Sequence, residues 1–187
     1  MTLKSIRYTN FNNIYLIGPM GSGKTSVGKQ LAHLTKKFFY DVDVEVEKHV
    51  GINIAEIFRR DGEKSFRKQE VKTIASLCKL NNIVLSTGGG SVLINTNRQH
   101  LFNNGIVIYL TIPVEVQLER ISKRADTRPL LVKYSSKEKL YQLNKERELL
   151  YKILADFAYL TSEVKPHQLA LKILMDIQKV YKSTYAH

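Results

Sequence analysis

The residues best suited to chemistry form one glycine-rich run near the start of the chain. The run Gly18–Thr25 reads GPMGSGKT and fills every fixed position of the pattern G-x-x-x-x-G-K-[ST]. Glycines in such a loop allow successive backbone N–H groups to point at phosphate oxygens. Lys24 can reach the β- and γ-phosphates of a nucleotide, and the Thr25 hydroxyl is placed to ligate Mg²⁺. The run therefore predicts a nucleoside triphosphate site of the P-loop type.

The segments on either side have the patterns that this motif requires. Ile14–Ile17 is an apolar run typical of a buried parallel strand, and Val27, Leu31 and Leu34 recur with helical spacing. The helix would add its positive N-terminal end to the phosphate site. A glycine turn that merely joins strand to helix is the alternative, but the flanking elements in register argue against it. The residues expected to cradle the triphosphate of ATP are Gly21, Ser22, Gly23, Lys24, Thr25 and Ser26.

Two aspartates follow the next short apolar segment. Asp41 and Asp43 come at the C-terminal end of a strand predicted over residues 38–41, on the edge where open α/β sheets bind ligands. Either carboxylate could help to hold hydrated Mg²⁺ or accept a proton from a substrate hydroxyl. The alternative is that Asp43 caps a helix over Val44–Val50. Because a P-loop motif precedes them, we favour a functional role for the pair.

Two further features predict a binding site for an anion. Arg67 and Glu70 lie three residues apart on a helix predicted over residues 63–80, so they can pair. On a solvated face the pair would contribute little, whereas in a cleft Glu70 would aim the planar guanidinium at a carboxylate; the spacing leaves both open. A strand over residues 83–86 runs into the glycines 88–90. This is either a flexible turn or a place where a ligand approaches the backbone closely, and its position at the end of a strand favours the latter.

A basic segment over residues 120–130 places Arg128 directly before Pro129, which disfavours helix at that arginine. Such a loop could close over a triphosphate and supply an arginine to the transferring phosphoryl group. An ordinary solvated loop is the alternative. A long helix is predicted over residues 137–157, and Arg147 and Tyr151 lie four residues apart on it.

With the P-loop motif, D-x-D, F-R-x-x-E, the triple glycine and R-P-L-L in this order, the sequence resembles the shikimate kinase family over about residues 14–177. The resemblance implies an α/β fold of three layers, in which helices cover a five-stranded parallel sheet. It also implies a lid over about residues 123–137, separate substrate-binding helices and a single domain over residues 1–187. The implied activity is phosphorylation of the 3-hydroxyl of shikimate by ATP and Mg²⁺, in aromatic amino acid biosynthesis.

The resemblance implies where nucleotide and metal bind. Thr25 would ligate Mg²⁺ directly, and Asp41 would contact it through water. Arg128 matches the lid arginine that meets the phosphates. Arg124 and Pro166 would pack against adenine.

The same resemblance implies how shikimate binds. Arg67 and Arg147 match a pair that grips the substrate carboxylate, and Glu70 would orient Arg67. Asp43 matches the residue that hydrogen-bonds the ring hydroxyls and is proposed as the base. The backbone site for substrate comprises Gly88, Gly89 and Gly90. The implied catalytic residues are Lys24, Asp43 and Arg128.

The chain departs from the family pattern in two places. The family often has R-x-P-L-Y where this chain has Arg147-Glu148-Leu149-Leu150-Tyr151, so the local helix is expected to run on. The family also often has an arginine seven residues before the lid arginine. Ile121 occupies that position here, which leaves Arg120 or Arg124 to take its place.

Composition limits the remaining possibilities. The formal net charge is +12, but the basic residues are scattered and no nucleic-acid-binding signature appears, so we expect an anionic small substrate rather than nucleic acid. No stretch approaches about 20 apolar residues, so no membrane partner is expected. Cys78 is the only cysteine, which fits a buried side chain and a reducing cytoplasm. We expect a monomer.

Two other functions stay open. The chain could phosphorylate another small hydroxy acid, such as gluconate, or it could be a catalytically idle homologue that binds nucleotide and regulates a partner. The triple glycine with Arg67 and Glu70 favours a ring carboxylic acid over gluconate. Lys24, Asp43 and Arg128 are all present, which argues against an idle homologue.

Overall fold

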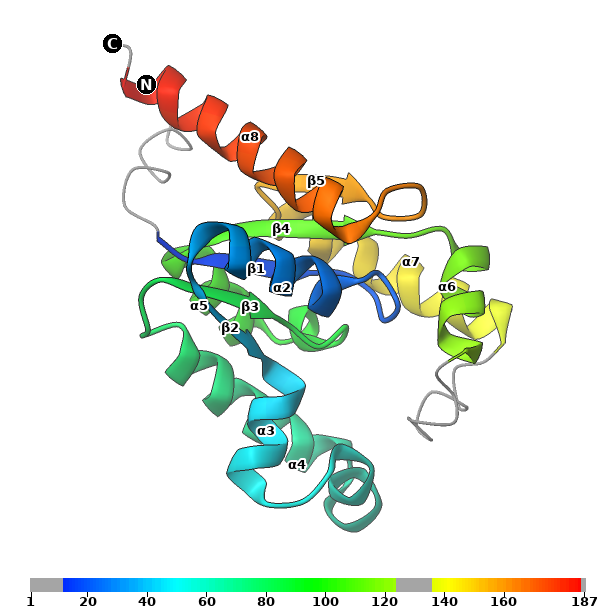
Figure 1. Cartoon of the computed structure of the whole chain (residues 1–187). Coiled ribbons are helices and arrows are strands. Elements are labelled where there is room, and N and C mark those ends of the chain that lie inside the picture. Colours follow the sequence, from blue (N-terminus) through cyan, green and yellow to red (C-terminus); the bar gives the residue numbers. More distant parts are fainter. Residues whose placement is uncertain (1–11, 124–135, 186–187) are drawn as a thin grey trace.

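Five short apolar runs form the strands of one parallel sheet, and helices cover both of its faces (Figure 1). The computed structural model describes residues 12–123 and 136–185. Neighbouring strands pair in parallel in the order β2-β3-β1-β4-β5. The predicted three-layer α/β fold with a five-stranded parallel sheet is therefore confirmed. The strands are β1 (Ile14–Ile17), β2 (Phe38–Asp41), β3 (Ile83–Ser86), β4 (Ile106–Thr111) and β5 (Phe157–Leu160).

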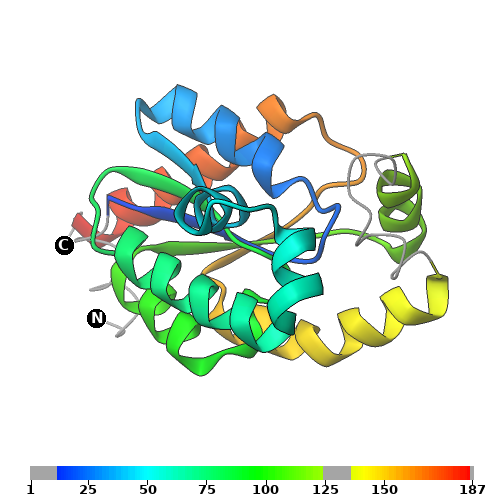
Figure 2. The ribbon, with the colours of Figure 1, turned by 90° about the horizontal axis from the view of Figure 1, so that it is seen from below.

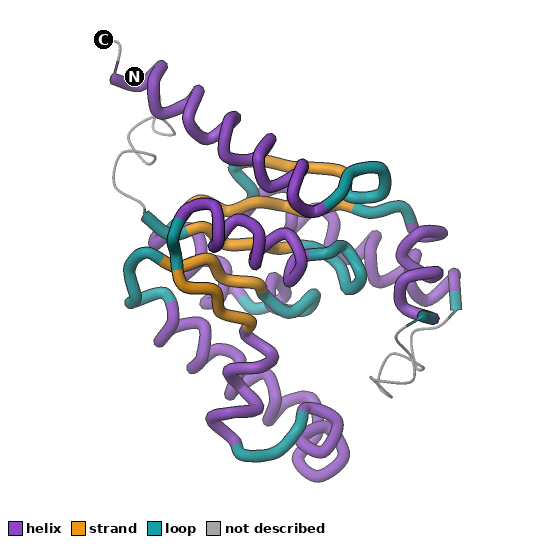
Figure 3. Tube along the Cα trace, in the orientation of Figure 1, coloured by secondary structure: helices purple, strands orange, loops and turns teal. Residues whose placement is uncertain are grey.

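The helices divide between the two faces of the sheet (Figures 2 and 3). One face packs against α2 (Lys24–Thr35) and α8 (Pro166–Tyr185), and the other against α4 (Ile54–Leu77), α5 (Asn95–Asn104) and α7 (Lys137–Leu154). Three shorter elements complete the described chain: α3 (Val42–Val50), α6 (Val114–Ser122) and the 3₁₀ turn η1 (Ser91–Leu93). Among the helices that the structure describes, none is both long and apolar enough to cross a bilayer.

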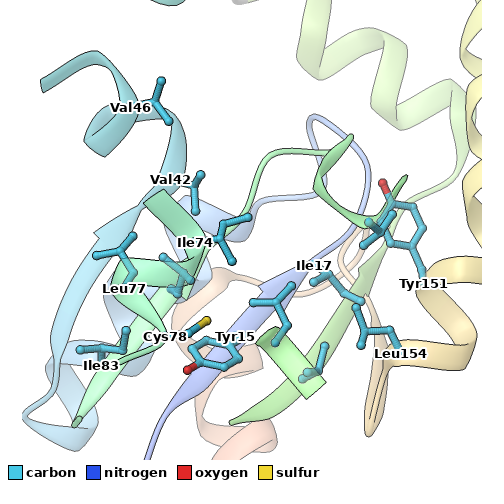
Figure 4. Close-up of a cluster of buried hydrophobic side chains, with 14 of the residues drawn as sticks. Tyr15, Ile17, Val42, Val46, Ile74, Leu77, Cys78, Ile83, Tyr151 and Leu154 are labelled. Atoms are coloured by element: carbon cyan, nitrogen blue, oxygen red, sulfur yellow. The ribbon is translucent and has the colours of Figure 1, made fainter. Parts of the chain in front are cut away.

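The central strand β1 explains why the sheet has two cores. Ile14 and Leu16 pack among the residues of α2 and α8. Tyr15 and Ile17 point to the other face, where Figure 4 shows them with Ile74. Successive side chains of a strand alternate between faces, so a strand buried on both faces reads as a continuous apolar run. This is why residues 14–17 were recognisable as a parallel strand.

Cys78 follows α4 and lies in the second core, where it is 4% exposed. Burial raises the pKa of its thiol from 9.0 to about 11. Because the thiolate is the reactive form, we expect a thiol reagent at pH 8 to label the native protein at least about 100-fold more slowly than the urea-unfolded chain. Timed labelling of this single cysteine measures the difference, and rapid labelling of native protein would contradict its burial.

The raised pKa of Cys78 also has a consequence for stability. Between pH 9.0 and about 11 the unfolded chain releases the thiol proton while the folded chain retains it. The folded state then binds more protons, so the contribution of this group to the free energy of unfolding falls as the pH rises through that interval.

Three element boundaries differ from the predicted ones. The helix predicted to reach Phe157 ends at Leu154, and Phe157 instead begins β5. The helix predicted over residues 63–80 ends at Leu77 as part of α4, which Gly62 interrupts with a φ of +74°. The third difference, at the start of α3, concerns the candidate site. Pro166 is the first residue of α8, a position where its fixed φ and missing N–H cost nothing.

Asn13 closes the end of the sheet at which β1, β3 and β4 begin. Its side chain is 3% exposed and donates from Nδ2 to the carbonyl oxygens of Leu80 at 2.7 Å and Asn104 at 3.3 Å. Its Oδ1 accepts from the backbone N–H of Ile83 at 3.1 Å, and its own carbonyl accepts from Ile106 N–H at 3.0 Å. One buried amide thus joins the segments that enter three neighbouring strands.

Candidate active site

The glycine-rich loop lies between β1 and α2, as the motif predicted. Gly21 and Gly23 have φ values of +75° and +86°, which side chains with a Cβ atom rarely adopt. The Nζ of Lys24 donates to the carbonyl oxygens of Gly18 and Pro19, both at 2.8 Å. The lysine is 8% exposed, so its charge is held within the loop.

Ser22 sits at the centre of this loop and is completely buried. Its Oγ has no hydrogen-bond partner among the residues that the structure describes. A buried hydroxyl left unpaired costs free energy, and a phosphate oxygen bound in the loop would satisfy it. Ser26 lies half-buried in the first turn of α2. The loop therefore fits a phosphate group.

Thr25 and Asp41 form the second part of the site. The Oγ1 of Thr25 donates to Oδ2 of Asp41 at 2.8 Å. Among the described residues no group of three His, Cys, Asp or Glu side chains converges on one point. A cation here would thus take most of its ligands from phosphate and water, which is how Mg²⁺ is commonly bound. The hydroxyl and carboxylate oxygens present fit that ion.

The residue that caps α3 is Asp41, and the alternative in which Asp43 caps a helix over residues 44–50 is wrong. Asp41 Oδ1 accepts from the backbone N–H of Asp43 at 3.2 Å, so the helix begins at Val42. Asp41 ends the strand with an extended backbone. Asp43 therefore lies in the first turn of the helix rather than on an extended segment, and the strand-to-helix turn places the two carboxylates.

Arg67 and Glu70 form a pair that is buried and not on a solvated face. Glu70 is completely buried, and its Oε2 accepts from Nη1 of Arg67 at 2.8 Å. Its Oε1 accepts from the Ser91 hydroxyl at 2.6 Å. Burial alone would lower the pKa of Arg67, but the carboxylates of Glu70 and Glu63 outweigh it and raise the pKa. The guanidinium stays charged and is held in one orientation.

The triple glycine packs against these charged side chains. A Cβ atom at Gly88 would lie 2.9 Å from Oε1 of Glu70 and 3.2 Å from Oδ1 of Asp43. A Cβ atom at Gly90 would overlap the guanidinium of Arg67. The structure therefore brings Asp43, Arg67 and the glycines together. Close approach of side chains to the backbone explains why no larger residue stands there.

Gly89 links this region to the phosphate loop and to α7. A Cβ atom at Gly89 would lie 3.2 Å from the backbone nitrogen of Met20, so the two loops touch. The carbonyl oxygen of Gly89 accepts a hydrogen bond from the hydroxyl of Tyr151. Tyr151 stacks on Tyr109 with 4.9 Å between ring centroids. The Tyr151 hydroxyl thus ties the glycine loop, which touches the phosphate loop, to α7.

Arg147 lies one turn before Tyr151 on α7. The helix continues to Leu154, as expected from the absence of a proline. The Nε of Arg147 is buried and has no hydrogen-bond partner in the described part of the chain. Burial raises the pKa of Tyr151, and the nearby Arg147 opposes that rise. A buried guanidinium nitrogen with spare donor capacity fits an anionic ligand.

Two residues of α6 hold the phosphate loop, and sequence reasoning missed one of them. Gln117 donates from Nε2 to the carbonyl of Met20 at 3.0 Å. Arg120 donates to the carbonyl oxygens of Gly21 at 3.2 Å and Thr161 at 2.8 Å. Gln117 is the residue that was missed. Its polar amide stands on the apolar side of the helix, four residues before Ile121, and this could have indicated a buried hydrogen-bonding role. Ser91, which donates to Glu70, was likewise given no role from the sequence.

Comparison with known proteins decides which family this arrangement belongs to. A family model described as shikimate kinase matches residues 20–178. The chain belongs to the shikimate kinase family. A shikimate kinase of Coxiella burnetii (strain CbuK_Q154) is 53% identical over 175 residues, which is 93% of this chain and 95% of that protein. A shikimate kinase of Buchnera aphidicola is 44% identical over 90% of this chain and 97% of that protein.

Solved structures agree with the family. A shikimate kinase from Acinetobacter baumannii, in complex with shikimate, superposes with a TM-score of 0.86 at 41% identity, covering 94% of this chain and 97% of that one. A shikimate kinase from Aquifex aeolicus gives 0.75 at 35% identity, covering 89% and 96%. A gluconokinase from Sinorhizobium meliloti gives 0.58 at 14% identity, covering 92% and 95%, a likeness of fold alone.

The predicted site residues of this shikimate kinase family member are not all described. Arg124 and Arg128, with most of the predicted lid, lie outside the described residues. Pro166 is exposed at the start of α8. The other predicted residues lie in the phosphate loop and the first turn of α2, at the junction of β2 and α3, on α4, in the glycine loop after β3 and on α7.

Proposed function

We propose that this chain transfers the γ-phosphoryl group of ATP to the 3-hydroxyl of shikimate, giving shikimate 3-phosphate and ADP in aromatic amino acid biosynthesis. One observation carries the proposal. The buried pair of Arg67 and Glu70 faces a glycine loop that touches the P-loop. A carboxylate site thus lies directly beside a triphosphate site.

The carboxylate of shikimate would bind to Arg67 and Arg147. Arg67 is fixed by Glu70, and Arg147 offers its buried Nε. Charge-assisted hydrogen bonds from guanidinium groups suit a planar carboxylate. The backbone of Gly88, Gly89 and Gly90 would face the ring.

Asp43 would receive or position the hydroxyl that attacks. The proton of the 3-hydroxyl passes to the Asp43 carboxylate as a bond forms from that oxygen to the γ-phosphorus. The bond from the γ-phosphorus to the bridging oxygen breaks, and ADP leaves. Such transfer depends chiefly on positioning and charge stabilisation. Asp43 is suitably placed, since its Oδ1 lies against Gly88.

Lys24 would exchange the carbonyl oxygens of Gly18 and Pro19 for the β- and γ-phosphates. We propose that Arg128 meets the same phosphates and that Arg124 and Pro166 contact adenine. Arg120 contacts Gly21 and Thr161, so we assign it to supporting the phosphate loop and leave the adenine contact to Arg124.

Thr25 and Asp41 would hold Mg²⁺, Thr25 directly and Asp41 through water. The ion neutralises charge on the phosphates when it is bound. We expect Asp41→Asn to raise the Mg²⁺ concentration for half-maximal activity about ten-fold, because an amide attracts a cation less than a carboxylate does. A magnesium titration of initial rates measures this, with Asp61→Asn, an exposed aspartate on α4, as control. An unchanged magnesium requirement would remove Asp41 from the metal site.

We also propose that the protein acts as a cytoplasmic monomer without a nucleic-acid or membrane partner. The lone buried cysteine fits a reducing compartment. Sedimentation velocity tests the monomer.

The test of the function is ADP release with ATP and Mg²⁺ in the presence of shikimate, gluconate, a nucleoside monophosphate or no acceptor. We expect ADP only with shikimate. Turnover with gluconate would keep the phosphate site and overturn the assigned acceptor. Tight ATP binding without turnover on any acceptor would favour a regulatory homologue instead.

A further inference from the structure

One face of α7 is anchored on both sides of Arg147. Asn144, Arg147 and Tyr151 are spaced by three and four residues, so they lie on the same side of the helix. Tyr151 donates to the carbonyl of Gly89. Asn144 donates from Nδ2 to Oε1 of Gln117 at 2.8 Å. The arginine with the buried Nε thus lies between two fixed points.

Gln117 connects Asn144 to the phosphate loop. It is 1% exposed, and both ends of its amide are used. Nε2 donates to the carbonyl of Met20 at 3.0 Å, while Oε1 accepts from Asn144. A backbone carbonyl can only accept, so the Met20 oxygen fixes which end of the amide faces the loop. The other end must then accept, which requires a donor from α7.

Gln117 also packs against the loop that it holds. A Cβ atom at Gly21 would lie 3.6 Å from Cγ of Gln117. The chain of contacts from Asn144 through Gln117 to Met20 is therefore short, directional and buried in its middle. Movement of α7 relative to the phosphate loop would break a hydrogen bond of a buried group, which is costly.

We propose that the bridge between Asn144 and Gln117 is a positioning device that sets the acid-binding helix α7 against the phosphate loop. It acts through Arg147 on one side and Met20 on the other, and so aligns the acceptor hydroxyl with the γ-phosphoryl group. This inference rests on the proposed function, because it takes Arg147 to bind the acid.

The kinetic consequence differs from that of a binding residue. When the bridge is lost, Arg147 on α7 keeps its contact with the acid and the phosphate loop keeps its contacts with ATP. Both substrates therefore still bind. Their relative placement changes, and small misplacements of reacting atoms lower the rate of the chemical step strongly. The loss is therefore expected in kcat and not in KM.

Asn144→Leu tests this, because leucine has a similar size and no donor. We expect kcat to fall about ten-fold while KM for ATP and for shikimate changes less than about three-fold. Single-turnover measurements locate the loss in the chemical step. Gln142→Leu is the matched control, since it removes an exposed amide from the same helix, and it is expected to leave kcat unchanged.

The double variant separates a bridge from two independent effects. If Asn144 acts through Gln117, then Gln117→Met combined with Asn144→Leu lowers kcat no further than Gln117→Met alone. Multiplied losses would overturn the bridge. So would a rise in shikimate KM with normal kcat, which would make Asn144 a binding residue, or a lowered melting temperature with normal kcat, which would make it purely structural. Absence of turnover by the wild-type chain with shikimate would overturn the proposed function itself.

Discussion

Replacement of Asp43 by asparagine is expected to lower kcat by about 10²–10³-fold with the fold retained. The substitution keeps the shape of the side chain and the backbone N–H that Asp41 accepts. It removes the carboxylate that takes or orients the hydroxyl proton, a contribution of about 10²–10⁴-fold in other enzymes. Steady-state kinetics with shikimate and ATP measure the loss, and thermal unfolding checks the fold.

The control for this variant is Asp61→Asn, which makes the same chemical change at an exposed position of α4. It is expected to have wild-type kcat. Normal turnover by Asp43→Asn would remove Asp43 from the site. A large fall in melting temperature for Asp43→Asn would instead indicate that its carboxylate serves mainly to stabilise α3.

Adding one methyl group at Gly90 is expected to raise KM for shikimate by about 10–100-fold, with KM for ATP unchanged. Gly90 has a φ of −94°, so its backbone accepts alanine without strain. The new Cβ would overlap the guanidinium of Arg67. A flexible arginine can move away, but it then leaves Glu70 and no longer points at the acid. Loss of a charge-assisted hydrogen bond of about 1.5–3 kcal/mol gives this range.

An Arg67→Met background shows whether Gly90→Ala acts through Arg67. In that background the alanine should change shikimate KM little further, because the guanidinium that it displaces is already gone. An equal additional rise in KM would mean that the methyl group blocks the substrate directly. The two single variants should keep the same KM for ATP.

The sequence predicted those parts of the site that are formed by residues close together along the chain. Gly21, Gly23, Lys24 and Thr25 follow one another along the chain, so their spacing alone describes the loop. The strands β1 and β3 were recognisable because burial on both faces leaves mainly apolar residues, as in Ile14–Ile17. Here local pattern and tertiary environment coincide.

Contacts between distant residues could not be predicted in the same way. The position of the Arg67–Glu70 pair in a cleft was one of two open interpretations, because spacing does not reveal burial. The bridge of Gln117 to Asn144 joins residues 27 positions apart, and no single-chain pattern specifies such a pair. The alternative that placed the cap of α3 at Asp43 was wrong because both aspartates suit an N-cap, and the extended backbone of Asp41 and its hydrogen bond from the N–H of Asp43 distinguish them.

The buried amide of Asn13 has a consequence for how this enzyme can change. It secures the end of the sheet at which the strands begin, while the groups assigned to chemistry stand where the strands finish. The stability that Asn13 provides and the catalytic groups thus lie at opposite ends of the same sheet. Substitutions that stabilise the Asn13 end of the sheet are therefore expected to raise the melting temperature while leaving kcat unchanged.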